Sequence, residues 1–279
     1  MPEENSISIV IRTFNSAKTL GQVFAGMRLE KGDEFIVVDS GSTDATLEIA
    51  NKHGAKIVIA PKPFHYSKSL NLGFRAAINP WVLVMSSHCI PVVEDFLGIH
   101  RREIATFAPD VVVGFAPSTL SGASDPSLDR EKTTFYSKDD YEGVCGICAN
   151  SNTIYRRSAW DELPFDETVR TAEDKLWIME MSRRGYRFAY IPTARGVNRN
   201  QASLIYMFNK GYRDARSLRK SPYKPMSLWH LGGAWKNLAK QRIRGEIDSG
   251  NWIRCSAHAL GQFLGTHRSE DNTPRGGAS

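Results

Sequence analysis

Hydrophobic positions over the first 190 residues form short continuous runs, separated by stretches in which apolar residues recur at helical spacing. The runs are rich in Val and Ile and are short enough for buried strands. They occupy residues 7–13, 35–39, 56–60, 81–85, 111–116, 149–155 and 187–191. Amphipathic helices are predicted after residue 16, after residue 43, over 67–77 and from residue 174. This alternation predicts βαβ units, and so an α/β domain with a mostly parallel sheet flanked by helices.

The chain beyond residue 203 has a helical pattern throughout. Helices are predicted over 204–218, 228–243 and 252–264, and prolines interrupt the chain between the first two. We therefore expect a main domain over residues 1–205, a helical extension over 206–267 and a disordered tail over 268–279. Within the main domain, the polar stretch 117–144 is expected to be a long functional loop.

Polar residues follow three of the predicted strands. They are Thr13-Phe14-Asn15 after the first strand, Asp39 at the end of the second, and Ser86-Ser87-His88 after the fourth. Parallel strands place their carboxyl ends at one edge of a sheet, where ligands bind in open α/β folds. Asp39 is suited to accept hydrogen bonds from a ribose or base there, although an acid before Gly-Ser-Thr is also a common turn residue. Neither a glycine-rich dinucleotide motif nor a P-loop follows the first strand, so we expect a nucleotide site without a glycine cradle.

Composition narrows the class of protein. The 279 residues are 41% hydrophobic, begin with an acidic polar segment and contain no run near the roughly 18 apolar residues of a membrane span. We therefore expect a chain that is free in the cytoplasm or attached to the inner face of the membrane.

Four cysteines do not make a disulfide framework in a chain this long. Cys145 and Cys148 form a C-x-x-C pair, but zinc would need two more ligands, so we favour buried thiols.

Positive charge is concentrated in one part of the chain. The net charge is +6, and residues 183–244 hold fifteen Lys or Arg against one acid, Asp214. Such a block predicts an anionic partner, which could be a substrate phosphate, an acidic lipid or nucleic acid. Aromatic residues are not interleaved with the basic ones, and no helix-turn-helix or finger motif occurs, so nucleic acid is not expected.

The basic residues of the helical extension fall on two helices. They are Arg213, Arg216, Arg219 and Lys220 on the first, and Lys236, Lys240, Arg242 and Arg244 on the second. A packed helix with a solvated charged face is one interpretation. The other, given equal weight, is a peripheral membrane surface with Trp229 and Trp235 at the interface and the cations on anionic lipid, which would suit a lipid-linked acceptor.

Several motifs occur in an order that points to one family. They are SIVIRTFN, EFIVVDSGSTDAT, SLNLGFRAA, the stretch 146–155, FDETVRTAED and RRGYRFAYIP. In this order they resemble the family 2 glycosyltransferases of the GT-A fold, and some stretches resemble bacterial rhamnosyltransferases. The resemblance covers about residues 5–205. It implies an inverting transfer of a sugar from a nucleotide-sugar donor to a glycan or lipid-linked acceptor, in cell-surface polysaccharide or glycolipid synthesis.

The resemblance also implies roles for individual residues. Thr13, Asn15 and Asp39 would line the nucleotide pocket, and Asn71 would lie near the donor. Asp174 matches the general base, and Glu173 would orient it or hold the acceptor. A base is required because an acceptor hydroxyl is a poor nucleophile until a carboxylate takes its proton. An acid at the start of a helix is also favoured by the helix dipole alone, which is the competing explanation for Asp174.

The sequence departs from the family at the metal site. Relatives carry a carboxylate after the fourth strand that binds Mn²⁺ or Mg²⁺ on the diphosphate, whereas this chain has Ser87 and His88. Histidines that complete the site in relatives are replaced by a run containing Arg199. His88 could ligate manganese through its imidazole. Alternatively, Arg199 could replace the cation and pair with the diphosphate, which is the hypothesis we favour.

Two other functions fit the same sequence. The chain could be a nucleotide-sugar- or glycan-binding protein that has kept the scaffold but lost catalysis, since a fold does not guarantee an activity. The altered metal motif favours that alternative and Asp174 argues against it. A nucleotidyltransferase would need a glycine- and arginine-rich loop after the first strand, and Thr13-Phe14-Asn15 is not such a loop.

Overall fold

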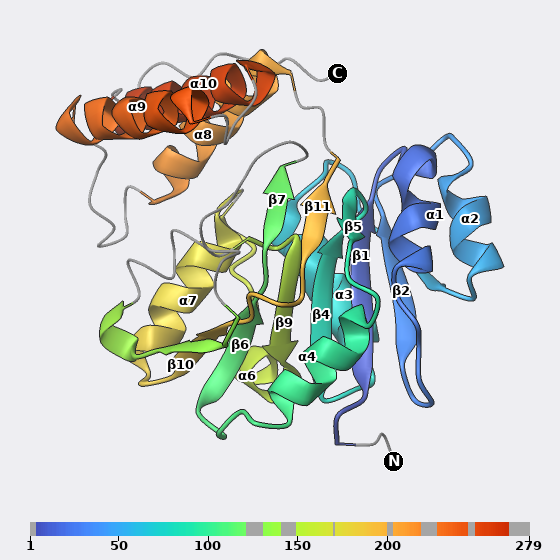
Figure 1. Ribbon diagram of the computed structural model, residues 1–279. Coiled ribbons are helices and arrows are strands. Elements are labelled where there is room, and N and C mark those ends of the chain that lie inside the picture. Colours follow the sequence, from blue (N-terminus) through green and yellow to red (C-terminus); the bar gives the residue numbers. More distant parts are fainter. Residues whose placement is uncertain are drawn as a thin grey trace. The chain divides into compact units, whose positions relative to one another are not determined.

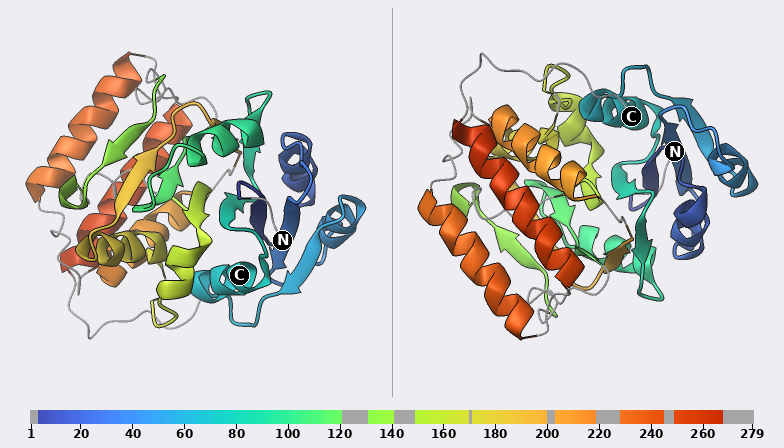
Figure 2. Two further views of the ribbon diagram at one scale, coloured as in Figure 1. Left: turned by 90° about the horizontal axis from the view of Figure 1, so that it is seen from below. Right: turned by 90° about the horizontal axis from the view of Figure 1, so that it is seen from above.

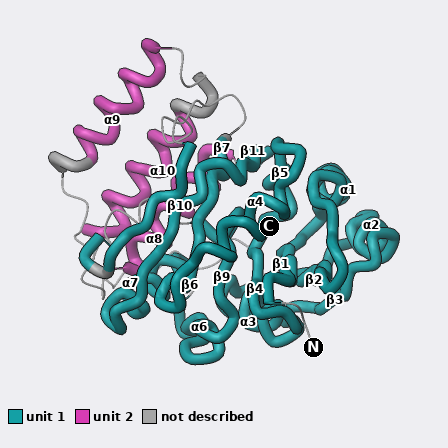
Figure 3. Tube along the Cα trace, turned by 60° about the horizontal axis from the view of Figure 1, so that its bottom comes forward, with its two compact units in different colours: residues 1–200 teal, residues 201–279 magenta. Residues whose placement is uncertain are grey.

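The computed structural model describes residues 4–120, 131–140, 149–169, 171–199, 203–218, 228–244 and 249–267. The chain divides into two compact units, residues 1–200 and residues 201–279 (Figure 3).

An eight-stranded sheet forms the centre of the first unit (Figures 1 and 2). Its strands are β1 (Ile7–Thr13), β2 (Glu34–Asp39), β3 (Lys56–Ile59), β4 (Trp81–Ser86), β6 (Val111–Phe115), β8 (Thr134–Tyr136), β9 (Asn152–Arg156) and β10 (Arg187–Tyr190). Their order across the sheet is β3-β2-β1-β4-β9-β6-β10-β8. Strands β9 and β8 run antiparallel to their neighbours, whereas the remaining pairs are parallel. The prediction of a mostly parallel α/β sheet is confirmed.

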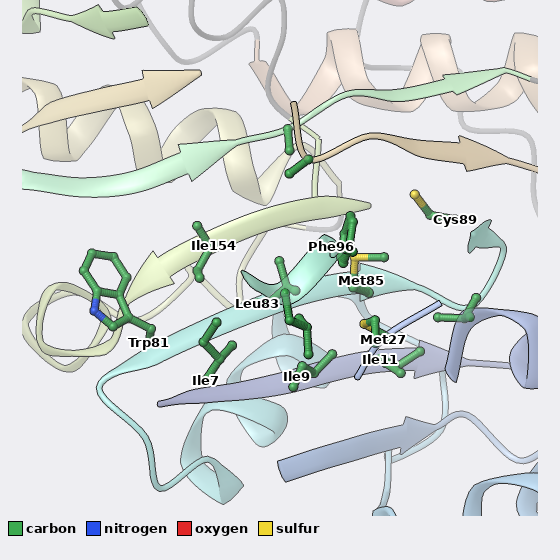
Figure 4. Packing of buried hydrophobic residues seen from close by; sticks show 14 of the residues in the cluster. Ile7, Ile9, Ile11, Met27, Trp81, Leu83, Met85, Cys89, Phe96 and Ile154 are labelled. Carbon is green, nitrogen blue, oxygen red and sulfur yellow. The ribbon is translucent and has the colours of Figure 1, made fainter. Parts of the chain in front are cut away.

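Helices cover both faces of this sheet because alternate strand residues point to opposite sides. The helices are α1 (Ala17–Ala25), α2 (Thr46–Lys52), α3 (Tyr66–Ala76), α4 (Phe96–Ile104), α6 (Arg157–Glu162) and α7 (Glu173–Arg183). On one face, Ile9 and Ile11 share a buried cluster with residues of α1 and α4 such as Phe96 (Figure 4). On the other face Val10 meets α3 at Gly73, where an added Cβ would lie 2.4 Å from a Val10 methyl. Helix α3 therefore needs glycine at this point to lie against the sheet.

A second, three-stranded sheet consists of β5 (Cys89–Pro91), β11 (Gly196–Asn198) and β7 (Ser118–Leu120), in the order β5-β11-β7. None of these strands was expected, because three residues are too few to show a periodicity. The stretch expected to be a long loop, 117–144, contains β7, β8 and a short 3₁₀ turn at Lys138–Asp140. Residues 121–130 and 141–148 lie outside the described part of the chain.

The second unit contains α8 (Leu204–Leu218), α9 (Leu228–Ile243) and α10 (Ser249–His267). Helices α8 and α10 approach closely at two glycines, since a Cβ at Gly211 would lie 2.2 Å from a backbone oxygen of α10 and one at Gly261 would lie 2.1 Å from a backbone oxygen of α8. No helix in the described part of the chain is both long and apolar enough to span a bilayer. The expected disordered tail, 268–279, lies outside the described residues.

Candidate active site

The candidate site lies at the edge formed by the carboxyl ends of β1, β2 and β4. Register pairs Thr13 with Asp39, and Arg12 with Ser86. Strand β9 runs in the opposite direction, so its start lies at this same edge, with Asn152 paired to Met85. Loops that are distant in sequence therefore meet here: those after β1, β2 and β4, and the segment that leads into β9 (Figure 1).

Asp39 joins the first two of these loops. Its carboxylate is fully buried and accepts hydrogen bonds from the Thr13 hydroxyl (2.9 Å), the Gly41 amide (2.8 Å) and both the amide (2.8 Å) and the hydroxyl of Ser42. Burial raises the pKa of Asp39, but the bonds from Ser42, Gly41 and Thr13 outweigh burial and hold that pKa below its ordinary value. Asp39 is therefore ionised and fixes the turn in which Gly41 takes a φ of 93°.

Asn15 and Ser87 extend the same platform. Asn15 has a left-handed φ of 46°, donates its amide to the Ser42 hydroxyl (2.8 Å) and accepts from the Thr43 amide (2.9 Å). Ser87 is buried, and its hydroxyl lies 2.7 Å from that of Ser16. The structure thus brings Thr13, Asn15, Asp39 and Ser87 together at one edge. Asn15 is exposed in this group. Both carboxylate oxygens of Asp39, in contrast, already accept hydrogen bonds from within the protein.

The two adjacent carboxylates lie at the start of α7. Asp174 is partly exposed, and its carboxylate accepts from the amides of Lys175 (2.8 Å) and Asn150 (3.2 Å). Glu173 is buried, accepts from the Asn150 side-chain amide (3.0 Å) and lies 3.8 Å from the Arg12 guanidinium. Among the described residues no cation pairs with Asp174. Its carboxylate is therefore oriented by backbone N–H groups.

The surroundings of the Glu173 carboxyl favour its protonated form. Burial and the neighbouring Asp174 raise the pKa of Glu173 above its ordinary 4.5, and Arg12 and Asn150 offset only part of this. As the pH rises from 4.5 through the raised pKa, the folded protein still holds a proton that the unfolded chain has released, so stability declines over that window.

Glu173→Gln removes this decline. We expect the difference in melting temperature between the variant and the wild type to grow as the pH rises from 4.5 through the raised pKa of Glu173. Differential scanning fluorimetry over a pH series measures the difference. Glu48→Gln, at an exposed position in α2, is the control and should follow the wild type at every pH. If the difference in melting temperature between Glu173→Gln and the wild type does not change with pH, the Glu173 carboxyl titrates alike in the folded and unfolded chain.

Asn71, which the resemblance places near the donor, makes several hydrogen bonds within the protein. It is buried in α3, and both functions of its amide are used within the protein. Its nitrogen donates to the Phe165 carbonyl (2.9 Å) and the Glu167 carboxylate (2.9 Å), and its oxygen accepts from the Trp160 indole (3.0 Å) and the Phe165 amide (3.1 Å). A role near the donor stays a prediction. These hydrogen bonds connect α3, through Asn71, to the segment before α7.

An aromatic cluster supports the same segment. Rings of Phe74, Tyr155, Trp160, Phe165 and Trp177 pack with centroid separations of 5.0 to 6.0 Å. The Trp177 indole, from α7, also donates to the Leu163 carbonyl (2.7 Å). Because α3, β9, α6 and α7 all contribute to this cluster, the start of α7 is held in place relative to the sheet.

His88 and Arg199 are neighbours, because the Arg199 amide donates to the His88 carbonyl (2.8 Å) beyond the paired ends of β5 and β11. Burial and the positive charge of Arg12 lower the pKa of His88 to about 4, so its imidazole is neutral at physiological pH. The Arg199 side chain is exposed.

These residues do not fit a divalent cation well. Mn²⁺ and Mg²⁺ prefer several oxygen ligands, whereas His88 supplies one nitrogen. The nearby positive charge of Arg12 would also repel the ion. The described residues contain no group of three or more His, Cys, Asp or Glu that could hold a metal. Cys89 is a buried free thiol, and burial raises its pKa to about 11. Cys145 and Cys148 lie outside the described residues.

The sequence interpretation missed Arg12 and Asn150. The signal for Arg12 is its place in a predicted buried strand, because a guanidinium inside an apolar strand is unusual. Asn150 gave no such signal, because its role arises from contacts with residues 23 and 24 positions away.

Comparison with known proteins agrees with this geometry. Residues 8–163 match the family model described as Glycosyl transferase family 2. The chain is 25% identical to the O-antigen chain rhamnosyltransferase RfbN of Salmonella typhimurium over 283 residues, which cover 93% of this chain and 88% of that protein. It is 32% identical to the uncharacterized glycosyltransferase Rv0539 of Mycobacterium tuberculosis over 83 residues, or 30% of this chain and only 37% of that protein.

Solved structures show the same fold. The mannosyltransferase PcManGT of Pyrobaculum calidifontis, in complex with GDP-Man and Mn²⁺, superposes with a TM-score of 0.57 at 16% identity, over 94% of this chain and 76% of that one. At this identity the likeness concerns the fold, which is that of GT-A glycosyltransferases.

Proposed function

Since the chain belongs to glycosyl transferase family 2, we propose that it transfers a sugar from a nucleoside-diphosphate sugar to an acceptor hydroxyl, with inversion at the anomeric carbon. The observation that carries this proposal is the Asp174 carboxylate, which is partly exposed, oriented by two N–H groups and located at the sheet edge where nucleotides bind in α/β folds.

The reaction follows from this arrangement. Asp174 takes the proton of the acceptor hydroxyl while its oxygen forms a bond to the anomeric carbon. The bond from that carbon to the diphosphate oxygen breaks, and the nucleoside diphosphate leaves with the electron pair. A single displacement by one base inverts the anomeric configuration. Thr13, Asn15, Asp39 and Ser87 form the platform on which we place the nucleotide.

The donor and the pathway are inferred from relatives. RfbN is named an O-antigen chain rhamnosyltransferase, and its match spans nearly the whole of both chains. We therefore propose a hexosyl or deoxyhexosyl donor, and a glycan or lipid-linked acceptor in polysaccharide synthesis. A nucleotide-sugar-binding protein without catalysis is the alternative, favoured by the missing metal carboxylate at residues 86–88.

A binding screen followed by a transfer assay tests this function. Thermal shift is measured with nucleoside diphosphates and their sugars, each with and without Mn²⁺. A ligand at a hundredfold its Kd should stabilise the folded chain by about 2.7 kcal/mol. We expect one nucleoside-diphosphate sugar to raise the melting temperature and then to serve as a transfer substrate. Stabilisation without transfer or donor hydrolysis would favour the binding protein, and no stabilisation by any nucleotide would contradict both functions.

We further propose that Arg199 stabilises the leaving diphosphate in place of a metal ion. A guanidinium binds phosphate oxygens in a bidentate manner, and this one is exposed beside His88. Turnover should therefore survive EDTA, and Arg199→Ala should lower kcat by about 10- to 100-fold, as loss of a charge-stabilising donor does in other enzymes. Arg183→Ala, an exposed change at the end of α7, is the control. Turnover abolished by EDTA and restored by Mn²⁺ would contradict this assignment.

For the second unit we propose attachment to an anionic membrane on its cytoplasmic side. Trp235 and Ile243 of α9 are 43% and 85% exposed, and the neighbouring cations Lys236, Lys240 and Arg242 are exposed as well. Arg219, Lys220 and the Trp229 side chain lie outside what the structure describes. Co-sedimentation with vesicles containing phosphatidylserine should be salt-sensitive and weakened by Trp235→Ala. Equal recovery with pure phosphatidylcholine vesicles would contradict a role for the basic residues.

A further inference from the structure

Asn150 has all four of its polar groups bonded to residues at the candidate site. Its amide N–H donates to Asp174 (3.2 Å) and its side-chain nitrogen to Glu173 (3.0 Å). Its carbonyl accepts from an Arg12 guanidinium nitrogen (3.1 Å), and its side-chain oxygen accepts from the Tyr155 hydroxyl (2.6 Å). One residue thus contacts both carboxylates directly and is itself held from two other elements.

Arg12 is held where it can act on this residue. Its side chain is only 14% exposed, lies on the α3 face of β1 and stacks over the Tyr66 ring at 5.1 Å. Besides the Asn150 carbonyl, the guanidinium faces Glu173 at 3.8 Å. Its Nε and Nη1 atoms are buried and have no hydrogen-bond partner within the part of the chain that the structure describes. Burying a guanidinium this incompletely bonded is unfavourable unless the charge serves a purpose.

We propose that Arg12 and Asn150 are positioning residues for the proposed transfer reaction: Arg12 fixes the Asn150 backbone, and Asn150 in turn aims Asp174 at the acceptor and holds Glu173 beside it. Neither residue touches the reacting atoms. The inference rests on the proposed function, because it assigns a purpose to the orientation of Asp174.

The chemistry explains why such support is needed. Two adjacent carboxylates at the start of one helix repel each other, and an unrestrained Asp174 would turn towards water. A misplacement of about 1 Å can lower a rate by about 100-fold. The Asn150 amide limits the rotation of Asp174, and the Arg12 charge offsets the negative charge of Glu173, so that proton transfer is directed to Asp174.

The test uses the full chain and the nucleoside-diphosphate sugar found by the binding screen. Asn150→Ala and Arg12→Gln should each lower kcat by about 10- to 100-fold, while the KM for the donor changes little. Tyr155→Phe removes only the hydroxyl that orients the Asn150 side chain, so it should lower kcat less and remain folded. A large rise in the donor KM with kcat unchanged would overturn the proposal, because it would place these residues in the donor pocket.

The pH profile of kcat provides a readout that a purely structural role would not move. Among the described residues, Arg12 faces Glu173 from α7, to which Asp174 is adjacent, and also His88 after β4 and Tyr66 from α3. Without the positive charge, the adjacent carboxyls of Glu173 and Asp174, one of which is the proposed base, take up a proton more readily. Arg12→Gln should therefore shift the acid limb of kcat to higher pH, and Arg12→Lys should restore it. If the acid limb of the pH profile of kcat does not shift in Arg12→Gln, the result would contradict the proposal.

Arg156 offers a matched control at the opposite edge of the sheet. It is also a strand arginine, bonded to the Ala108 carbonyl (3.3 Å) and stacked over the Trp81 ring at 4.4 Å. Arg156→Gln should lower stability without altering the pH profile.

Asp174→Asn, measured in the same assay, separates failure of the positioning role from failure of the proposed function. If that variant is inactive while Asn150→Ala and Arg12→Gln keep full kcat, only the positioning role fails. If Asp174→Asn is fully active, the proposed function fails.

Discussion

Asp174→Asn should lower kcat by about 10²- to 10⁴-fold while the Kd for the donor stays within about threefold of wild type. The amide has nearly the same shape as the carboxylate, and one of its atoms can still accept from the Asn150 N–H group. It cannot take the proton of the acceptor hydroxyl, so the loss falls on the chemical step. Initial rates with saturating donor, together with calorimetric titration of the donor, measure the two quantities separately.

Asp161→Asn is the matched control for this variant. Asp161 is an exposed helix carboxylate whose nearest cation is Arg157 at 3.8 Å, on a helix that packs against β9. Its replacement should leave both kcat and donor affinity unchanged. Donor affinity lost in Asp174→Asn, with kcat retained at high donor concentration, would mean that Asp174 binds the donor and some other group takes the proton.

Asn71→Ala should lower the free energy of unfolding by about 3 to 4 kcal/mol, the second large effect we expect. The change leaves the Trp160 indole N–H and the Phe165 amide buried without an acceptor, and each unsatisfied group costs about 1–3 kcal/mol. At about 2–4 °C per kcal/mol, the melting temperature should fall by about 10 °C. Because the segment anchored by Asn71 leads into α7, kcat should fall as well.

Asn51→Ala, on the exposed side of α2, is the control and should change stability by no more than about 0.5 kcal/mol. The comparison also decides between the two roles considered for Asn71. An unchanged melting temperature combined with loss of donor binding would contradict the structural role and restore the position near the donor that the family resemblance implied.

The sequence was sufficient to predict those parts of the fold that depend on continuous apolar patterns. Strands such as β1 and β4 are mostly apolar runs rich in Val, Ile and Leu, and α3 and α8 carry a regular helical spacing over 11 and 15 residues. The short elements β5, β7, β11 and α6 could not be predicted, because three to six residues do not repeat a period often enough to identify it. Their positions depend on tertiary pairing, as the contact between His88 and Arg199 does.

Some residues of the candidate site could likewise be predicted from the sequence, and others could not. Asp39 and Asp174 could be proposed because each carboxylate follows or begins a recognisable element. The partners could not be predicted, since Asn150 reaches Glu173 from the segment before β9 and Arg12 reaches it from β1. For Asn71 the sequence motif indicates a position near the donor, which stays a prediction, whereas its internal hydrogen bonds to Trp160, Phe165 and Glu167 could not be predicted from the sequence.

The anomeric configuration of the first-formed product tests the central claim most directly, because that claim is a single displacement in which Asp174 is the only base. Proton NMR of the product, recorded before any mutarotation, gives this configuration from the coupling at the anomeric position. We predict a configuration opposite to that of the donor. Retention of the donor configuration would require a second displacement or a different mechanism, and would contradict the role assigned to Asp174.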